Sequence, residues 1–237
     1  TAGVLAGTKK SWLEQYGLAF EGLSGFKPAY LVPRENFTGD IPAYEYALYE
    51  GASQWRAAGA AKVVAGLGEP LFQRSPAHYT SHAQSPFDHV TDHAAAAVSG
   101  HVALAGFPLG ASYYSQGYWV YRALLRHLLK STLPEPLIVT DAPVSTEITV
   151  TWQDAPRPRY LVHVVNWSAN RGTPRHPVFH EEPVTLHGVT VRLNLPLQSV
   201  GVKAVVSGLT LTGRRAGAGV EVSVPPVKVH EILEFEA

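Results

Sequence analysis

Residues 100–130, GHVALAGFPLGASYYSQGYWVYRALLRHLLK, contain a strand-like segment, a loop and a helix-like segment in that order. Residues 101–107 form an apolar run of strand length, and the Pro and Gly residues of 108–110 interrupt it. From Trp119 to Lys130, apolar residues recur every three or four positions, which indicates an amphipathic helix with one buried face. The apolar residues of this pattern are Val120, Ala123, Leu124, Leu128 and Leu129. This order is typical of a parallel strand followed by its helix. We therefore expect an α/β domain in the first half of the chain.

The remaining elements of the first half are short. A helix is expected around residues 10–16, because Gly17 follows as a stop signal. Strand-like runs separated by Pro and Gly occupy residues 29–32, 46–49 and 62–65. Residues 70–99 read as a loop that is rich in Pro and His and ends in an Ala-rich stretch.

The composition changes at residues 133–136, LPEP, after which β-branched and alternating runs dominate. Candidate strands are residues 147–152, 160–166, 189–195, 202–206, 209–212, 220–224 and 227–235. Seven short strands about ten residues apart predict an antiparallel β-sandwich. We expect this domain to span 136–237 and the α/β domain to span 1–135.

Charge and hydropathy exclude several classes of partner. The chain has 19 basic and 19 acidic residues, so nothing in its charge favours binding to nucleic acid or to an anionic membrane. Its apolar runs are far shorter than the roughly 20 residues of a membrane span, and the long apolar core of a signal peptide is absent. The 46% hydrophobic content suffices for a packed core. We expect a soluble, cytoplasmic protein.

The sequence contains neither cysteine nor methionine. Without cysteine it has no disulfide, no thiolate metal site and no cysteine nucleophile. The absence of methionine from a chain that opens on Thr1 suggests a piece of a longer protein.

A histidine-rich segment is the most distinctive candidate for a metal-binding or catalytic site in the sequence. Its candidate residues are His78, His82, Asp88, His89, Asp92 and His93. Histidines four residues apart on one helix are able to ligate zinc, which would suit a small metal-dependent or His/Asp-dependent hydrolase. However, Pro76 and Pro86 prevent one helix from presenting all of them. We favour a loop whose polar side chains satisfy backbone groups, and we expect no metal and no cofactor.

Aromatic residues are concentrated where the loop meets the amphipathic helix. They are Tyr113, Tyr114, Tyr118, Trp119 and Tyr121. Such rings favour packing in a core or between subunits, because Tyr and Trp bury large areas and are enriched at protein interfaces. A sugar-stacking platform is the alternative. The residues Tyr113, Tyr114, Tyr118 and Trp119 are therefore candidates for contact with a carbohydrate or with a second subunit of a homo-oligomer.

Glycoside cleavage requires two carboxyl groups about 5–10 Å apart across a pocket. Nothing places the close pairs Asp88 with Asp92 or Glu181 with Glu182 across a cleft, so we interpret these acids as solvated.

Two further motifs lie in the second half. Asn166-Trp167-Ser168 fits the triplet for N-glycosylation, which is common by chance. Residues 171–177, RGTPRHP, form a polar loop that would suit an anion or a neighbouring subunit, although a solvated loop is the simpler interpretation.

The chain resembles the C-terminal part of bacterial glycoside hydrolases related to the family 29 α-L-fucosidases and to β-galactosidases with a trimerisation domain. The resemblance covers nearly the whole sequence. The segments that carry it are His78–His82 with Ser85-Pro86, Gly106–Tyr114, Tyr160–Trp167, Arg171–Pro177 and Val189–Pro196.

The resemblance implies a catalytic (β/α)8 barrel first, then a flavodoxin-like domain similar to class I glutamine amidotransferases, then a small β-domain. This chain would begin inside the second domain, which is not itself catalytic in such hydrolases. It therefore carries over no catalytic residue. We expect a non-catalytic accessory and oligomerisation region, with a small hydrolase and a sugar-binding module as the alternatives.

Overall fold

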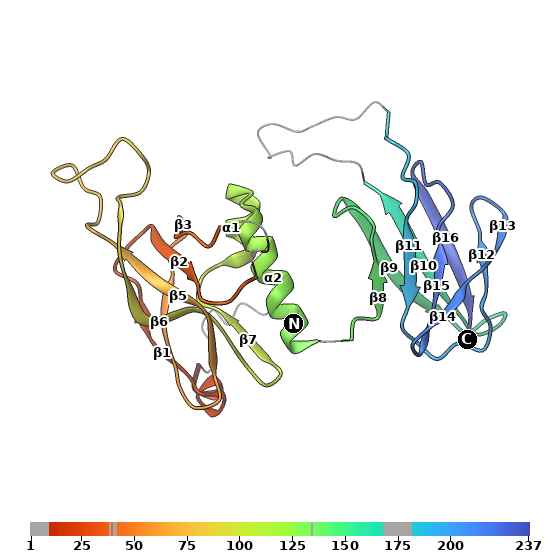
Figure 1. Ribbon diagram of the computed structural model, residues 1–237, viewed down its shortest axis with the longest axis horizontal. Coiled ribbons are helices and arrows are strands. Elements are labelled where there is room, and N and C mark those ends of the chain that lie inside the picture. Colours follow the sequence, from red (N-terminus) through yellow and green to blue (C-terminus); the bar gives the residue numbers. More distant parts are fainter. Residues whose placement is uncertain (1–9, 38, 40–41, 134, 168–181) are drawn as a thin grey trace. The chain divides into compact units, whose positions relative to one another are not determined.

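The computed structural model describes residues 10–37, 39, 42–133, 135–167 and 182–237. The chain divides into two compact units, Thr1–Pro134 (unit 1) and Glu135–Ala237 (unit 2), as Figure 1 shows. Strands account for 45% of the chain and helices for 13%, so both units are built mainly on β-sheets. None of the helices in the described residues is long and apolar enough to cross a membrane.

The main sheet of unit 1 has five strands in the order β3-β2-β5-β6-β7. Their bounds are β2 Ala29–Pro33, β3 Tyr46–Leu48, β5 Lys62–Pro70, β6 Phe87–Ser99 and β7 Val102–Ala105. Every neighbouring pair in this sheet is antiparallel. Strands β6 and β7 form a hairpin that pairs Ser99 with Val102, and Gly100 turns the chain with a φ of +55°. Glycine suits that turn because L side chains rarely adopt positive φ.

The flavodoxin-like α/β interpretation of residues 1–135 is therefore wrong. The expected parallel strand at 101–107 is β7, which pairs antiparallel with β6 instead of leading into a parallel crossover. Strand β6 occupies much of the segment 70–99 that was expected to be a loop. A strand, a loop and a helix in sequence do not by themselves specify the direction of the neighbouring strand.

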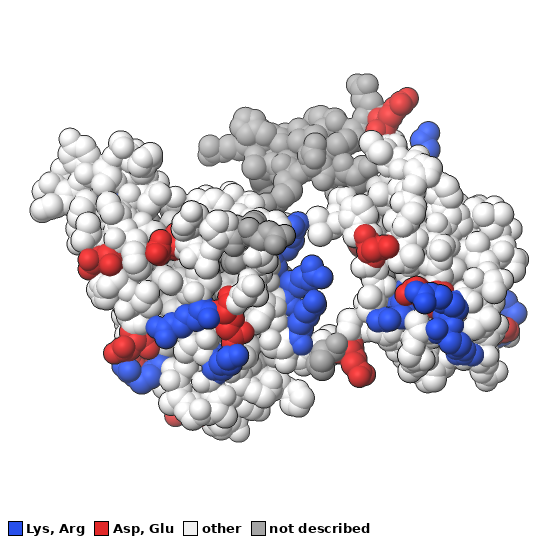
Figure 2. All heavy atoms as spheres, viewed as in Figure 1, with Lys and Arg blue, Asp and Glu red and all other residues white. Residues whose placement is uncertain are grey.

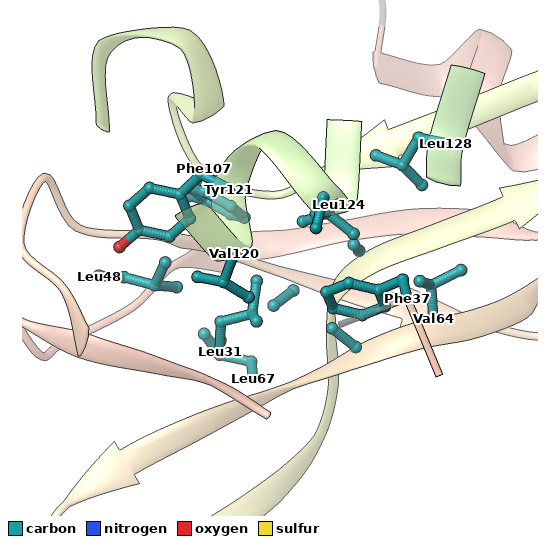
Figure 3. Close-up of a cluster of buried hydrophobic side chains, with 14 of the residues drawn as sticks. Leu31, Phe37, Leu48, Val64, Leu67, Phe107, Val120, Tyr121, Leu124 and Leu128 are labelled. Atoms are coloured by element: carbon teal, nitrogen blue, oxygen red, sulfur yellow. The ribbon is translucent and has the colours of Figure 1, made fainter. Parts of the chain in front are cut away.

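Two helices follow β7, namely α1 Leu109–Gln116 and α2 Trp119–Thr132. The amphipathic helix predicted from Trp119 onwards is confirmed, whereas α1 had been expected to be loop. Figure 3 shows side chains of α2 pointing towards those of β2 and β5, among them Leu124, Leu31 and Leu67. These side chains belong to the larger hydrophobic core of unit 1, which α2 and one face of the sheet enclose.

A second layer packs on the sheet with its own small core. It consists of the 3-10 helix η1 Lys10–Tyr16 and the antiparallel pair β1 Leu18–Leu23 and β4 Ser53–Ala57. Leu18 and Trp55 from this layer cluster with Ala94 and Ala97 of β6. At the start of β1, Gly17 has a φ of +72°, and a Cβ there would overlap the carbonyl oxygen of Ala58. Only glycine fits this position.

Strand β6 is covered on both faces, which explains its unusual sequence. Ala95 and Ala96 belong to the core beneath α2, whereas Ala94 and Ala97 belong to the core beneath β1 and β4. Because side chains alternate along a regular strand, this grouping requires an irregularity, and the register with β5 shifts in this region.

Unit 2 contains two antiparallel sheets that share one hydrophobic core. The five-stranded sheet has the order β13-β12-β16-β10-β9, and the four-stranded sheet has the order β14-β15-β11-β8. Their bounds are β8 Ile138–Thr140, β9 Thr146–Gln153, β10 Arg159–Asn166, β11 Thr190–Leu193, β12 Gly201–Ala204, β13 Leu209–Thr212, β14 Arg214–Ala216, β15 Gly219–Ser223 and β16 His230–Glu236. The predicted β-sandwich is confirmed. The short strands β8 and β14 were not predicted.

Charged side chains of opposite sign lie near one another on the face shown in Figure 2. Arg56 pairs with Glu21 and Lys62 with Glu35 in unit 1, and in unit 2 Glu234 pairs with both Arg157 and Arg159.

Candidate functional site

The candidate residues of the histidine-rich segment are divided between a connecting loop and a strand in the structure. His78 and His82 lie exposed in the connection between β5 and β6, and His89 and His93 lie on β6 itself. His89 Nδ1 is 2.8 Å from the carboxylate of its neighbour Asp88. Within the described part of the chain, no three His, Asp or Glu side chains group closely enough to hold a metal ion.

His93 takes part in a charge cluster that links three strands. Its Nε2 is 2.9 Å from Glu21 Oε2 on β1, and Arg56 on β4 donates two hydrogen bonds to the same carboxylate. The hydrogen bond from Arg56, followed by that from His93, lowers the pKa of Glu21 to about 2. Asp92, the other candidate here, lies exposed. The hydrogen bond to Glu21 raises the pKa of Arg56, and the negative charge of Asp92 adds a smaller contribution. The cluster ties β6 to the β1–β4 layer.

The aromatic candidates separate into different environments. Tyr113 on α1 is half-buried against the core, and Tyr114 is 62% exposed. Tyr121 is fully buried, and its hydroxyl donates to the carbonyl oxygen of Ala47 at 2.6 Å. The expected core packing is therefore found at Tyr121. Tyr118 and Trp119, at the start of α2, line an open pocket.

This pocket has a volume of about 340 Å³ and lies within unit 1. Its walls come from β2, β3 with the residues directly before and after it, the connection before β6 and the start of α2. The lining residues are Tyr30, Glu45, Tyr46, Ala47, Tyr49, Gln84, Tyr118, Trp119 and Val120. Five of these side chains are aromatic, one is a carboxylate and one is an amide. A concave site that combines apolar walls with a few polar groups is the usual form of a small-molecule site.

Hydrogen bonds to the backbone fix several of the wall tyrosines. The Tyr30 hydroxyl donates to the carbonyl oxygen of Ser85, and the Tyr46 hydroxyl donates to that of Pro42 at 2.6 Å. Burial raises the pKa of both phenols, so both remain neutral donors near pH 7. These bonds attach two walls of the pocket to neighbouring loops.

Tyr49 and Gln84 form the polar contact of the pocket. The Tyr49 hydroxyl donates to Gln84 Oε1 at 2.8 Å. Burial, and then the neighbouring Tyr118, raises the pKa of Tyr49 to about 12. A phenol with this pKa keeps its proton at neutral pH and engages the amide oxygen of Gln84, which leaves the amide nitrogen to act as a donor.

The dense aromatic segment 113–121 predicts Tyr118 and Trp119 as site residues, but the residues of the opposite wall were not predicted. The available signal was the segment YEYALYE at residues 44–50, in which aromatic and acidic residues alternate over a short distance. Gln84 carried no signal, because nothing local connects it to Tyr49.

Asn166 of the glycosylation triplet has a structural role. Asn166 is buried, and its Nδ2 donates to the carbonyl oxygens of Val184, Val227 and Lys228. An amide used in this way is not accessible for modification in the folded chain. The polar loop at residues 171–177 and the acidic residue Glu181 lie outside the described residues.

Comparison with known proteins finds similarity in structure but not in sequence. No family model matches the sequence, and no curated protein is significantly similar to it. Among solved structures, α-L-fucosidase isoenzyme 2 from Paenibacillus thiaminolyticus is similar, with a TM-score of 0.82 and 20% sequence identity. The alignment covers 93% of this chain and 33% of the fucosidase chain. The chain thus spans about a third of the length of that protein.

At this identity the similarity concerns the fold. The resemblance to fucosidase-related glycoside hydrolases is confirmed at that level, whereas the amidotransferase-like domain type is not supported. Both units of this chain, a helix-covered antiparallel sheet and a β-sandwich, together share the fold of one part of a fucosidase chain.

Proposed function

We propose that this chain is a non-catalytic accessory and assembly region of a fucosidase-type glycoside hydrolase. The observation that carries the proposal is the fold shared with a fucosidase over 93% of this chain but only 33% of the other. A region that makes up a third of such an enzyme is large enough to serve assembly or substrate delivery while another part performs the cleavage.

The electrostatics of the carboxyl groups support a non-catalytic role. A glycosidase needs a general acid whose pKa is raised so that it stays protonated near neutral pH. For the described carboxyl groups with a clear shift, the shift is always downwards: Glu21, Glu35, Asp141, Glu231 and Glu234. Burial raises the pKa of Glu234, but hydrogen bonds and charge from Arg157 and Arg159 outweigh it. Glu21, Glu35 and Glu234 are held in ion pairs, and Asp141 and Glu231 accept hydrogen bonds from backbone N–H groups, so these carboxylates suit structural roles better than proton transfer.

The catalytic test uses chromogenic substrates. The purified chain is incubated with 4-nitrophenyl α-L-fucoside and with 4-nitrophenyl β-D-galactoside. We expect no release of nitrophenol above the buffer control. Turnover that co-purifies with the chain would overturn the non-catalytic part of the proposal.

An exposed apolar row on α2 supports the assembly part. Leu125 and Leu129 are exposed and four residues apart on α2, so they share one side of the helix, and the exposed Leu133 follows directly after its last residue. Contiguous exposed apolar surface often marks a site of protein association. Leu129 had been expected on the buried side of the helix, but it is 53% exposed.

Light scattering during size-exclusion chromatography tests self-association. We expect a mass that is a fixed multiple of 25.6 kDa, and we expect Leu129→Glu to reduce it towards the monomer. Leu209→Glu is the matched control, because Leu209 is 49% exposed but lies on β13 of unit 2. A wild-type mass that stays at 25.6 kDa at every concentration would overturn the assembly part.

A further inference from the structure

The aromatic pocket of unit 1 has a chemistry that the accessory role does not explain. We propose that it binds one sugar unit of a carbohydrate, with the sugar ring packed against Trp119 and its hydroxyl groups bonded to Gln84 and Glu45. This inference deepens the proposed function and rests on it for the class of ligand. Three features of the pocket support such a ligand: the exposed ring of Trp119, the free polar atoms and the charge of the lining residues.

Trp119 provides an accessible aromatic surface. It is 40% exposed at the start of α2, whereas Tyr121, two residues further along and on another side of the helix, is fully buried in the core. Tyr118 lies between these two environments and is in ring contact with both Tyr49 and Tyr121. Trp and Tyr side chains combine an apolar ring with one polar atom, which suits a ligand that has apolar faces and a polar rim. A pyranose ring has this character.

The polar atoms of the pocket complement hydroxyl groups. The Tyr49 hydroxyl donates a hydrogen bond to Gln84 Oε1, whereas none of the described residues is hydrogen-bonded to Gln84 Nε2. Glu45 lines the same pocket with an exposed carboxylate, which only accepts hydrogen bonds when ionised. The pocket thus offers an amide donor and a carboxylate acceptor. Neighbouring sugar hydroxyls both donate and accept, so they are able to engage both groups.

Charge narrows the class of ligand. Among the described residues, no Lys or Arg lines the pocket, and Glu45 would repel an anion. A quaternary ammonium ion is the main competitor, because aromatic rings and a carboxylate attract cations. The free donor nitrogen of Gln84 disfavours a cation but suits a hydroxyl oxygen. The combination therefore favours a neutral polyhydroxy ligand.

The bonds of the wall residues indicate a largely preformed site. The Tyr30, Tyr46 and Tyr49 hydroxyls each have a partner within unit 1. Fixed walls reduce the ordering that binding would otherwise require. The volume of about 340 Å³ lies at the small end of the range for small-molecule sites, as expected for a ligand as small as one sugar unit.

The test is a calorimetric titration of the full chain with L-fucose, D-galactose, D-glucose and methyl glycosides of each, with choline as the competing ligand class. We expect saturable binding of at least one sugar and no binding of choline. Trp119→Ala should weaken the sugar affinity by about tenfold or more, and Gln84→Leu should weaken it several-fold. Trp119→Phe, which retains an aromatic ring, should recover most of the affinity.

Two controls locate the effect. Trp152→Ala removes a tryptophan of similar exposure, 46%, from β9 of unit 2 and should leave the affinity unchanged. Circular dichroism of each variant establishes that it is folded. Sugar binding that survives Trp119→Ala would overturn the location, and choline binding that Trp119→Ala abolishes would overturn the ligand class.

The same samples separate the two proposals. If none of the sugars binds at millimolar concentration, the pocket proposal falls and the accessory role stands. If the chain hydrolyses aryl fucosides, the accessory role falls, while the effect of Trp119→Ala on binding still decides the pocket.

Discussion

Unit 1 and unit 2 are both antiparallel β-structures, but they build their cores from different side chains. The core of unit 2 consists almost entirely of Val and Leu, with Ala204 as its one alanine among the buried cluster members. In unit 1, a run of four buried alanines, 94–97, lies on β6, an interior strand of the sheet. The difference follows from layering, because β6 is covered on both faces and large side chains would hold the layers apart.

This contrast explains why one unit was recognisable in sequence and the other was not. Strands with large β-branched residues on a buried face have a clear alternating signature. A strand of small residues between two layers loses that signature, since alanine has a low strand propensity. The more crowded sheet is therefore the harder one to detect.

The largest expected effect comes from opening a cavity in each core. Leu124→Ala in unit 1 and Leu193→Ala in unit 2 both truncate fully buried side chains. Each should lower the free energy of unfolding by about 2–5 kcal/mol. Hydrogen exchange should show loss of amide protection in β5 and β6 for the first variant, and in β10 and β11 for the second.

Leu209→Ala is the matched control, because an exposed leucine should change stability by no more than about 0.5 kcal/mol. Equal loss of protection in both units from a single variant would contradict the division into two cooperative units.

A smaller effect should come from crowding in the sheet of unit 1. A Cβ added at Gly68 on β5 would lie 2.7 Å from Phe87 Cε2 and 3.1 Å from the Cβ of Tyr30. Gly68→Ala should therefore cost about 1–3 kcal/mol of stability, measured by urea denaturation. Gly25→Ala is the control, because no atom lies within 4 Å of a Cβ there. If the two variants are equally stable, the sheet is less crowded than its alanines and glycines indicate.

The smallest effect concerns acid stability of unit 1. The pKa of Glu21 falls from 4.5 to about 2 in the folded chain, because Arg56 and then His93 bond its ionised form. The ionised carboxylate therefore stabilises the fold above pH 4.5, and this contribution is lost as the pH falls towards 2. Glu21→Gln should flatten the dependence of the melting temperature of unit 1 on pH in that window.

Glu14→Gln, at an exposed glutamate of η1, should retain the wild-type pH profile. Because the Glu21 cluster is largely at the surface, the difference should shrink in high salt. A wild-type profile in Glu21→Gln at low salt would mean that this cluster does not link the two layers.

The candidate site was only half visible in the sequence. Tyr118 and Trp119 stood out because they lie in a dense aromatic segment next to a periodic helix. Tyr30, Tyr49 and Gln84 did not, since they come from three other segments and meet only when β2, β3 and the connection before β6 surround the start of α2. The histidines attracted attention through their spacing, but a mixture of loop and strand keeps them apart.

The sequence by itself determined the elements whose periodicity is local. These are the amphipathic helix α2, most strands of the sandwich and the change of composition near residues 133–136. Only the tertiary structure decided that β7 runs antiparallel to β6, that a run of alanines lies in an interior strand, and that distant aromatic residues line one pocket. The reason is physical: side-chain periodicity reports which face of an element is buried, whereas strand direction and the assembly of a site depend on the neighbours that cover that face.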